Sequence, residues 1–192
     1  MKKDHQKHIA IFASGKGSNA QAIIDYFKDN DHIKIALIVT NNKEAGVIQI
    51  AKDHRIPFDI VSSKELKDEE ILDMLDVYEI DLIVLAGFLL LVPAFLVKAY
   101  PDKIINIHPA LLPKHGGKGM YGKYVHEAVL ADKDTESGIT IHYVNEHYDE
   151  GTYIAQIRCH VESGDTVETL SARVHQLEHE HYPKEIEKLL TS

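Results

Sequence analysis

The chain takes its architecture from the stretch His8-Ile-Ala-Ile-Phe-Ala-Ser14-Gly-Lys-Gly17-Ser-Asn-Ala20. An apolar run leads into a glycine loop, and apolar side chains then recur at helical spacing through Phe27. In such a layout the glycines let the backbone approach an anion, which the free N–H groups of the helix N-terminus attract. Ser18 and Asn19 can add side-chain hydrogen bonds. The sequence therefore predicts a phosphate cradle at this loop.

The same loop also fits the dinucleotide pattern Gly-x-Gly-x-x-Ala. That interpretation requires an acidic residue at the end of the next strand, where it would hold a ribose. The next apolar run, 34–40, ends in Asn41-Asn42-Lys43, and the first carboxylate, Glu44, lies past it. A single phosphate is therefore favoured over a dinucleotide. A tight turn that uses glycine only for its geometry stays open as an alternative.

Strand and helix patterns alternate through the first half of the chain. Strands are predicted at 34–40, 57–61, 81–86 and 103–108, and helices at 44–54, 63–78 (capped by Ser63) and 94–100. This alternation implies right-handed crossovers and a parallel sheet that is covered by helices.

The second half of the chain changes character after a predicted helix at 124–131. Runs 137–145 and 152–160 alternate polar and apolar residues around a turn-rich bend, which predicts an antiparallel hairpin. Asp165-Thr-Val-Glu168 has a capping-box pattern, and its helix should run to about Leu190 with a kink or a break at Pro183. The predicted fold is α/β: a mostly parallel, Rossmann-like sheet flanked by helices, with late antiparallel hairpin strands, in a single domain over 1–192.

Composition excludes several classes of protein. The chain is 44% hydrophobic and 27% charged, as in ordinary globular domains, and its net charge of −9 argues against a nucleic-acid surface. The longest apolar run, 82–93, is too short to span a bilayer, and the polar N-terminus has no signal-peptide pattern. One cysteine, Cys159, fits a reducing compartment. We therefore expect a cytoplasmic protein without nucleic-acid or membrane partners.

Asn106 and His108 are the candidate catalytic pair. They interrupt an apolar run two residues apart, so they point to the same side of an extended segment, and Pro109 ends that strand. Ligands bind at the carboxyl ends of strands in open α/β sheets. There an imidazole can exchange a proton near neutral pH, and an amide can hold a carbonyl oxygen or oxyanion.

Two further segments are candidates for walls of this site. Gly87-Phe-Leu-Leu-Leu-Val-Pro93 is too apolar for a plain surface loop. It predicts either a helix-packing segment or the apolar wall of a ligand slot at Leu89, Leu90, Leu91 and Val92. The stretch 114–122 has four glycines in nine residues, which predicts a flexible loop that folds over a substrate.

These segments belong to a larger set of motifs: Ala-Ser-Gly-Lys-Gly-Ser-Asn, Leu-Ala-Gly-Phe, Asn-Ile-His-Pro-Ala-Leu-Leu-Pro-Lys, Gly-Ile-Thr-Ile-His-Tyr-Val, Tyr-Asp-Glu-Gly and Leu-Glu-His-Glu-His-Tyr-Pro. Together they closely resemble the folate-dependent formyltransferases over essentially the whole chain. Asn-x-His-Pro with a later Asp-x-Gly is shared by that family. The Gly-x-Gly-Ser-Asn loop and the Glu-His before Tyr-Pro resemble its branch that formylates glycinamide ribonucleotide in purine synthesis.

The resemblance implies a formyltransferase fold and a role for each matching residue. The catalytic trio would be Asn106, His108 and Asp149. The ribonucleotide would be bound by Gly17, Ser18 and Asn19 at its phosphate, by Glu178 at its ribose hydroxyls, and by His175 and Pro109 nearby. The pterin of 10-formyltetrahydrofolate would contact Asn106, Leu89, Leu90, Leu91, Val92, Asn145, Glu146, His147 and Tyr148. Lys64 would contact the folate tail, where an arginine is more usual.

The implied chemistry fits these residue types. The glycinamide amine would attack the formyl carbon, and Asn106 with protonated His108 would stabilise the charge on the formyl oxygen. A nearby Asp149 is expected to raise the pKa of His108 and favour imidazolium, which would pass a proton to the folate nitrogen. Neither a covalent intermediate nor a metal is required. The resemblance leaves open a monomer or a homodimer.

Besides Lys64, the chain departs from the family pattern at three places. Lys16 stands where asparagine is commoner and should favour the phosphate, and Leu90 stands where arginine is common. The loop 116–124 is longer than the usual Pro-Gly turn, so its contacts with substrate are not implied by the resemblance.

Three other functions remain to be tested against the structure. His175-Gln-Leu-Glu178-His179 fits an inverted zinc-site pattern, because helical spacing puts both histidines on one face. The glycine loop alone would fit a nucleotide-binding module without catalysis. A formyltransferase could also act on another amine, such as an amino sugar or a charged tRNA.

Overall fold

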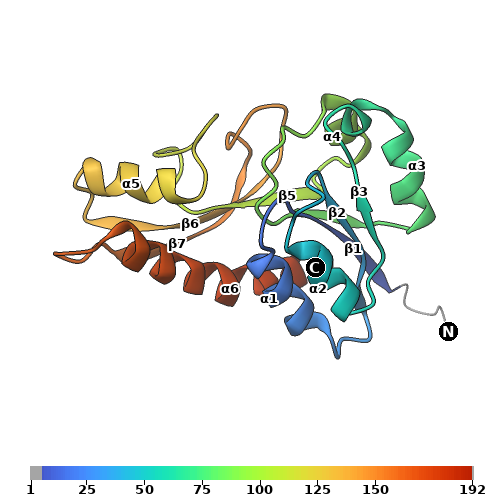
Figure 1. Cartoon of the computed structure of the whole chain (residues 1–192), viewed down its shortest axis with the longest axis horizontal. Helices are drawn as coiled ribbons and strands as arrows, with labels where there is room; N and C mark the ends of the chain where they lie inside the picture. The colour runs from blue at the N-terminus through green and yellow to red at the C-terminus, as the bar shows by residue number, and fades with distance from the viewer. Residues whose placement is uncertain (1–5, 192) are drawn as a thin grey trace.

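Seven strands build one sheet through residues 6–191, the part of the chain that this computed structural model describes (Figure 1). In chain order they are β1 (Lys7–Phe12), β2 (Ile33–Thr40), β3 (Phe58–Ile60), β4 (Leu82–Leu85), β5 (Ile104–His108), β6 (Glu136–Tyr143) and β7 (Tyr153–His160). Their spatial order is β3-β2-β1-β4-β5-β6-β7. The strands from β3 to β5 pair in parallel, whereas β6 and β7 pair antiparallel, which confirms the predicted fold class.

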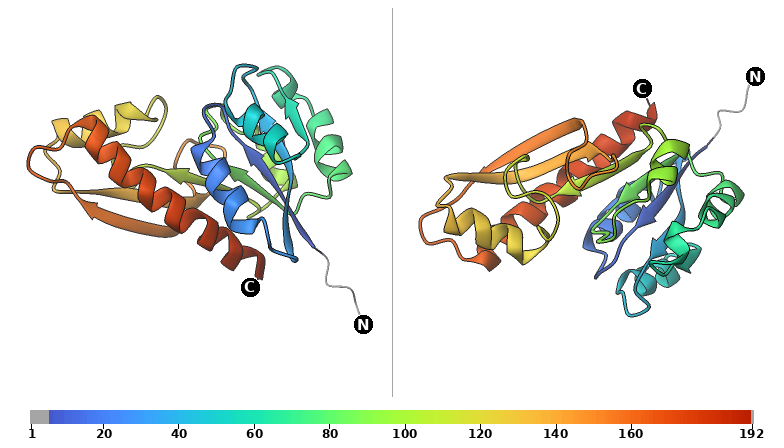
Figure 2. Two further views of the ribbon diagram at one scale, coloured as in Figure 1. Left: turned by 60° about the horizontal axis from the view of Figure 1, so that its bottom comes forward. Right: turned by 90° about the horizontal axis from the view of Figure 1, so that it is seen from above.

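Helices cover both faces of the sheet. They are α1 (Ser18–Phe27), α2 (Val47–Asp53), α3 (Glu70–Val77), α4 (Ala94–Ala99), α5 (Lys123–Ala131) and α6 (Val167–Thr191), with a 3-10 turn η1 (Glu65–Lys67). One core joins the sheet to α1, α2, α5 and α6, and the other joins it to η1, α3 and α4. Helices α1 and α6 contact each other on the first face (Figure 2). None of the helices within 6–191 has the length and apolarity needed to cross a bilayer.

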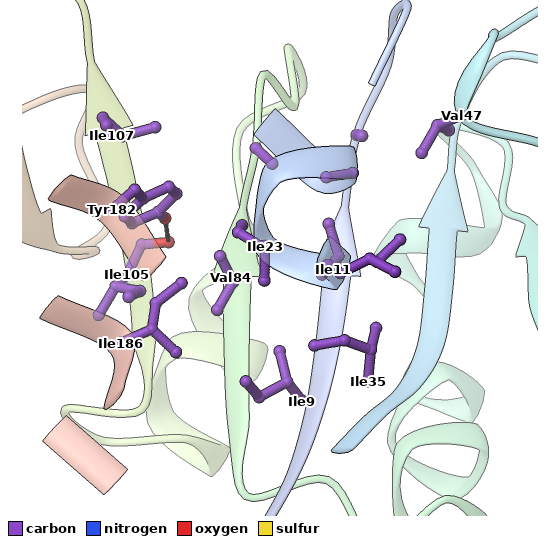
Figure 3. Packing of buried hydrophobic residues seen from close by; sticks show 14 of the residues in the cluster. Ile9, Ile11, Ile23, Ile35, Val47, Val84, Ile105, Ile107, Tyr182 and Ile186 are labelled. Atoms are coloured by element: carbon purple, nitrogen blue, oxygen red, sulfur yellow. Dashed lines mark hydrogen bonds between the residues drawn. The ribbon is translucent and has the colours of Figure 1, made fainter. Parts of the chain in front are cut away.

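The central strands are apolar at successive positions because both of their faces are covered. On β1, Ile9 and Ile11 enter the first core, and Ala10 and Phe12 enter the second. Figure 3 shows the first core, where isoleucines from neighbouring strands pack beneath Ile23 of α1 and two side chains of α6. Each fully buried isoleucine contributes about 1.5–3 kcal/mol to this packing. The sheet is therefore a rigid base for the loops at its edge.

Tyr182 ties α6 to two central strands. Its side chain is fully buried, and its hydroxyl donates to the carbonyl oxygens of Leu85 (3.0 Å) and Ile105 (3.3 Å; Figure 3). Burial raises the pKa of this phenol well above its usual value, so it stays a donor. Tyr182→Phe is expected to lower the free energy of unfolding by about 1 kcal/mol, measured by urea denaturation. The control is Tyr153→Phe at an exposed tyrosine, and equal stability of the two variants would contradict this role.

Two predicted helix starts were wrong because side chains cap elsewhere. The helix expected over 63–78 is divided into η1 and α3, and Ser62 rather than Ser63 begins the first turn. The Ser62 N–H donates to Glu65 Oε2 (2.8 Å), while its hydroxyl accepts from the Glu65 N–H (3.2 Å). In the second half, Thr166 exchanges such bonds with Thr169 (2.9 and 3.3 Å), so the capping pair is not Asp165 with Glu168.

Helix α6 continues through Pro183 and is not divided there. Both Pro183 and Tyr182 are buried, and Ile186 one turn later is fully buried in the same core. Packing on both sides of the proline therefore outweighs the backbone hydrogen bond that a proline cannot donate. Predicted ends of other elements moved by only a few residues; α2, for example, begins at Val47 rather than at 44.

Candidate active site

The candidate site lies where the sheet changes direction. From β1 the chain first builds outward through β2 to β3, and later returns to β4 on the other side of β1. Such a switch point leaves a crevice at the carboxyl ends of the strands. Ser14, just after β1, joins the loops around it: its hydroxyl donates to Asn41 Oδ1 (2.5 Å) and accepts from the Leu89 N–H (2.9 Å). The loops after β1, β2 and β4 are thus held together.

A cavity of about 340 Å³ opens beside this crevice. One part of its lining is the apolar segment Leu89–Val92. The polar part includes Asn106, His108 and Asp149, and the glycine-rich loop contributes 117–121. The remaining residues that line the cavity are Leu85, Gly87, Phe88, Ile107, His142, Val144, His147 and Tyr148.

The three side chains of the implied trio meet at this cavity. Asp149 Oδ2 lies 3.5 Å from His108 Nδ1, and its Oδ1 lies 3.5 Å from Asn106 Nδ2. The His108 side chain is 4% exposed and that of Asp149 is 10% exposed, so the pair is largely shielded from water. Asn106 and His108 point to the same side of β5, as period two predicted. Residues 106, 108 and 149 are thus brought together from β5 and from the distant bend between β6 and β7.

Backbone geometry explains the Asp-x-Gly pattern at this bend. Asp149 has a φ of 58°, in the left-handed region that aspartate tolerates better than most residues. At Gly151, a Cβ would lie 1.6 Å from the Tyr143 carbonyl oxygen, so only glycine fits. The Gly117 N–H then donates to Asp149 Oδ2 (2.9 Å) and fixes the carboxylate. The glycine at 151 therefore lets the bend return Asp149 to β5.

His142 belongs to the same cluster, although the sequence reasoning did not identify it. Its Nδ1–H donates to the Tyr143 carbonyl (2.8 Å), and its Nε2 lies 3.2 Å from Asn106 Nδ2 and 3.6 Å from Asp149 Oδ1. It stands directly opposite Asn106 in the β5–β6 register. The alternation of polar and apolar residues in β6 already placed His142 on the same face as Thr140, so its side could be predicted from the sequence. Its pairing with Asn106 depends on the strand register. This histidine orients the amide of Asn106.

The surroundings of His108 favour its neutral imidazole form. Burial lowers its pKa, and although Asp149 and the bond to the His115 carbonyl both raise it, the net direction is down. Asp149 raises the pKa as expected, but desolvation outweighs the carboxylate, so the expected imidazolium is not favoured. Its Nε2–H donates to the His115 carbonyl (2.7 Å), so the unprotonated nitrogen is Nδ1, which faces Asp149.

Asp149 supplies the negative charge beside this imidazole. Burial alone would raise the pKa of Asp149, but the His142 and His108 rings and the Gly117 N–H lower it, and the net direction is down. The carboxylate is therefore ionised at neutral pH. An imidazolium that forms at His108 would be stabilised by it.

A second polar cluster forms where α1 meets α6. Asn19 Nδ2 donates to Glu178 Oε2 (3.0 Å), and His175 Nδ1–H donates to the same oxygen (2.7 Å). Glu178 is 3% exposed, and its hydrogen bond raises the pKa of His175. Gly17, with a φ of 83°, turns the chain into α1, which begins at Ser18. The free N–H groups of the first turn of α1 point out of the helix end. The predicted phosphate and ribose residues thus lie together.

Comparison with known proteins identifies the family. The sequence profile of the family described as formyl transferase matches residues 7–186. This chain belongs to the formyl transferase family.

Relatives within the formyl transferase family share both sequence and fold. "Phosphoribosylglycinamide formyltransferase" of Bacillus subtilis (strain 168) is 39% identical over 190 residues, which are 96% of this chain and 95% of that protein. The protein of the same name, "chloroplastic", from Vigna unguiculata is 42% identical over 96% of this chain. The crystal structure of phosphoribosylglycinamide formyltransferase from Bacillus halodurans superposes with a TM-score of 0.87 at 38% identity, covering 97% of this chain and 96% of that one.

The plant relatives are longer than this formyl transferase. The chain spans 61% of the Vigna unguiculata protein and 63% of the one from Arabidopsis thaliana, which is 43% identical over 92% of this chain.

Some residues that the resemblance singled out lie outside the cavity lining. Asn145 accepts from the His147 N–H (2.9 Å) and shapes the turn that carries His147 and Tyr148 to the cavity. Its neighbour Glu146 is likewise not part of the lining. Lys64 is exposed at the start of η1. Pro109 follows His108 at the end of β5.

The zinc-site interpretation finds no support in this cluster. His175 and His179 stack one turn apart with ring centroids 6.2 Å from each other, but His175 Nδ1 is bonded to Glu178. Within residues 6–191, no three histidine, cysteine, aspartate or glutamate side chains are grouped to hold a metal ion.

Proposed function

We propose that this chain transfers the formyl group of 10-formyltetrahydrofolate to the glycinamide amine of N1-(5-phospho-D-ribosyl)glycinamide, which gives the N2-formyl product in de novo purine synthesis. The observation that carries this proposal is the meeting of Asn106, His108 and Asp149 at an apolar cavity. The proposed phosphate loop follows Ser14, whose hydroxyl accepts from the Leu89 N–H (2.9 Å) at the edge of this cavity. The proposed site for the phosphorylated amine and the proposed site for the flat formyl donor would thus both adjoin His108, which carries the proton.

The folate would occupy the cavity. Its volume of about 340 Å³ falls in the range of small-molecule sites, and the side chains and backbone of Leu89–Val92 suit a flat pterin ring. His147 and Tyr148 would enclose the ring from the bend, whose turn Asn145 and Glu146 shape. We assign Lys64, which is exposed at the start of η1, to the folate tail on the basis of the family resemblance.

The ribonucleotide would bind between α1 and α6. Its phosphate would accept from the N–H groups at Gly17, Ser18 and Asn19, where the helix N-terminus favours an anion. Glu178 would accept from the ribose hydroxyls. The Oδ1 atom of Asn19 is buried without a hydrogen-bond partner, so it would also serve as an acceptor for a ligand N–H or O–H, not for the phosphate.

Proton transfer would run through His108 Nδ1. As the glycinamide nitrogen bonds to the formyl carbon, neutral His108 takes the proton that the amine loses, and Asn106 stabilises the charge on the formyl oxygen. The imidazolium beside Asp149 then gives that proton to the folate nitrogen as its bond to the formyl carbon breaks. Neither a bond to the protein nor a metal ion takes part in these steps.

A steady-state transfer assay tests the proposed substrates. We expect the purified chain to convert 10-formyl folate to the deformylated folate, followed by absorbance, only when glycinamide ribonucleotide is present. An amino sugar and an aminoacyl-tRNA serve as competing acceptors. Faster transfer to either of them would replace the proposed acceptor.

Gly17 offers a direct test of the phosphate assignment. Its φ is 83°, and a Cβ would lie 2.9 Å from the Val47 Cβ, so Gly17→Ala should displace the N–H groups of the loop. We expect the KM for the ribonucleotide to rise at least about tenfold more than the KM for folate, because one or two phosphate bonds are lost. The matched control is Gly164→Ala in the turn before α6, where the φ is 97° and a Cβ meets no atom within 4 Å. Equal effects on both substrates would contradict the assignment.

The remaining proposals concern organisation. We propose a single formyltransferase domain over 1–192, in which the N-terminal half supplies the phosphate loop and the C-terminal half most of the folate site. As partners we propose only these small molecules, bound by a monomer or a homodimer. A cytoplasmic location is supported by the single, unpaired Cys159.

A further inference from the structure

Two consecutive residues after Pro113 bind one carboxylate. Lys114 Nζ lies 2.6 Å from Asp134 Oδ1, and His115 Nε2 lies 2.8 Å from Asp134 Oδ2. Asp134 stands in the turn between α5 and β6, away from the cavity lining. The hydrogen bonds from His115 and Lys114 lower the pKa of Asp134, so this carboxyl is ionised at neutral pH. The His115 ring is 8% exposed, whereas the Lys114 side chain is 61% exposed.

The backbone of the same segment reaches the catalytic groups. The His115 carbonyl accepts from His108 Nε2–H (2.7 Å), and two residues later the Gly117 N–H donates to Asp149 (2.9 Å). At Gly116 a Cβ would lie 2.5 Å from Leu112 Cδ2 and 3.3 Å from Asp149 Cβ, so the segment passes close to the carboxylate. The stretch 115–117 therefore contacts both His108 and Asp149 through backbone groups.

His115 holds an uncommon backbone conformation to make this contact. Its φ is 54°, in the left-handed region that side-chain-bearing residues adopt only when their surroundings hold them there. The bond between its ring and Asp134 is one such restraint. The conformation at 115 aims the carbonyl towards β5, so a loss of the ring's anchor should release the carbonyl from His108.

We propose that Asp134 and His115 form a brace that positions His108. Asp134 anchors the His115 ring, the His115 carbonyl holds the proton on His108 Nε2, and Nδ1 is thereby left towards Asp149 as the nitrogen that exchanges the catalytic proton. Asp134 and His115 are positioning residues, because neither side chain lines the cavity. The inference rests on the proposed function in one respect, since it assigns Nδ1 a role in formyl transfer.

Kinetics of three single variants test the brace. We expect Asp134→Ala and His115→Phe each to lower kcat by about 10- to 100-fold, because a small misplacement of a catalytic group has effects of this size. The KM for the ribonucleotide should stay within about twofold, since its binding cluster is untouched. The matched control is Lys114→Met, which removes the other partner of Asp134 and should leave kcat within about twofold. Equal losses in the control and in Asp134→Ala would overturn the proposal.

A double variant shows whether the loss of kcat in Asp134→Ala depends on His108. In a His108→Ala protein, adding Asp134→Ala should cause no further loss of kcat, because the group that the brace positions is already gone. The same fold-loss in both backgrounds would mean that Asp134 acts by another route and would overturn the brace.

Nuclear magnetic resonance of the imidazole nitrogens separates the brace from the proposed function, because it needs no turnover. In unliganded wild-type protein, His108 should carry its proton on Nε2, and Asp134→Ala should produce a mixture of tautomers. That change in a protein that transfers no formyl group would support the brace while the proposed function fails. An unchanged tautomer in an active enzyme would overturn the brace and leave the proposed function standing.

Discussion

Replacement of His108 by alanine is expected to lower turnover by about 10²- to 10⁴-fold, the usual contribution of a positioned acid or base. His108 is the one imidazole of the trio, and its Nδ1 faces Asp149 at 3.5 Å while Nε2–H is held by a carbonyl. Without it, the amine must lose its proton to water. Binding should change little, because neither the phosphate loop nor Leu89–Val92 depends on this side chain. Steady-state kinetics with both substrates varied will measure kcat and both KM values.

The control for His108→Ala is His160→Ala, which removes an exposed histidine from the far end of β7. We expect wild-type rates from the control. A His108→Ala enzyme within about threefold of wild type would remove this residue from the mechanism, and the proposed proton transfer with it.

Asp149→Asn is also expected to lower turnover by about 10²- to 10⁴-fold. The substitution keeps the shape of the side chain but removes the ionised carboxylate that faces His108. The imidazolium that forms during transfer then loses its counter-charge in a largely buried site, where a missing partner costs most. Asp149 also accepts from the Gly117 N–H, so the amide oxygen of asparagine should retain that loop contact. Melting temperatures of the two proteins will show whether the fold is kept.

The pH dependence of Asp149→Asn provides an independent check. Asp149 raises the pKa of His108 against the larger effect of burial. Its removal should lower this pKa further, so the limb of kcat/KM that reports free His108 should move to lower pH. A limb that moves to higher pH, or a variant with normal rates, would mean that the carboxylate does not act on this histidine.

Local patterns in the sequence were enough to predict the fold and to place Asn106 beside His108. The apolar run of β1, the glycine loop and the alternation of strands and helices are each recognised from neighbouring residues. They therefore predict the parallel sheet without knowledge of the packing. The period of two between Asn106 and His108 places them on one side of β5 whatever packs around them. Asp149 was reached only through the family resemblance, since no local pattern links a bend to a strand forty residues earlier.

What the sequence could not show depends on three-dimensional packing. The net pKa direction of His108 results from burial against one carboxylate, and burial is a property of the folded chain. His142 joins the site through strand register, and His115 through a carbonyl, which every residue has. The cap at Ser62 was missed by one residue because two adjacent serines are equally good caps.

The most direct test of the central claim follows the formyl carbon itself. With protein in excess over 10-[¹³C]formyl folate and glycinamide ribonucleotide, nuclear magnetic resonance after a single turnover should show the label on the glycinamide nitrogen, and His108→Ala should abolish its appearance on the same timescale. A label that stays on the folate, or that accumulates on the protein, would contradict direct transfer at Asn106, His108 and Asp149.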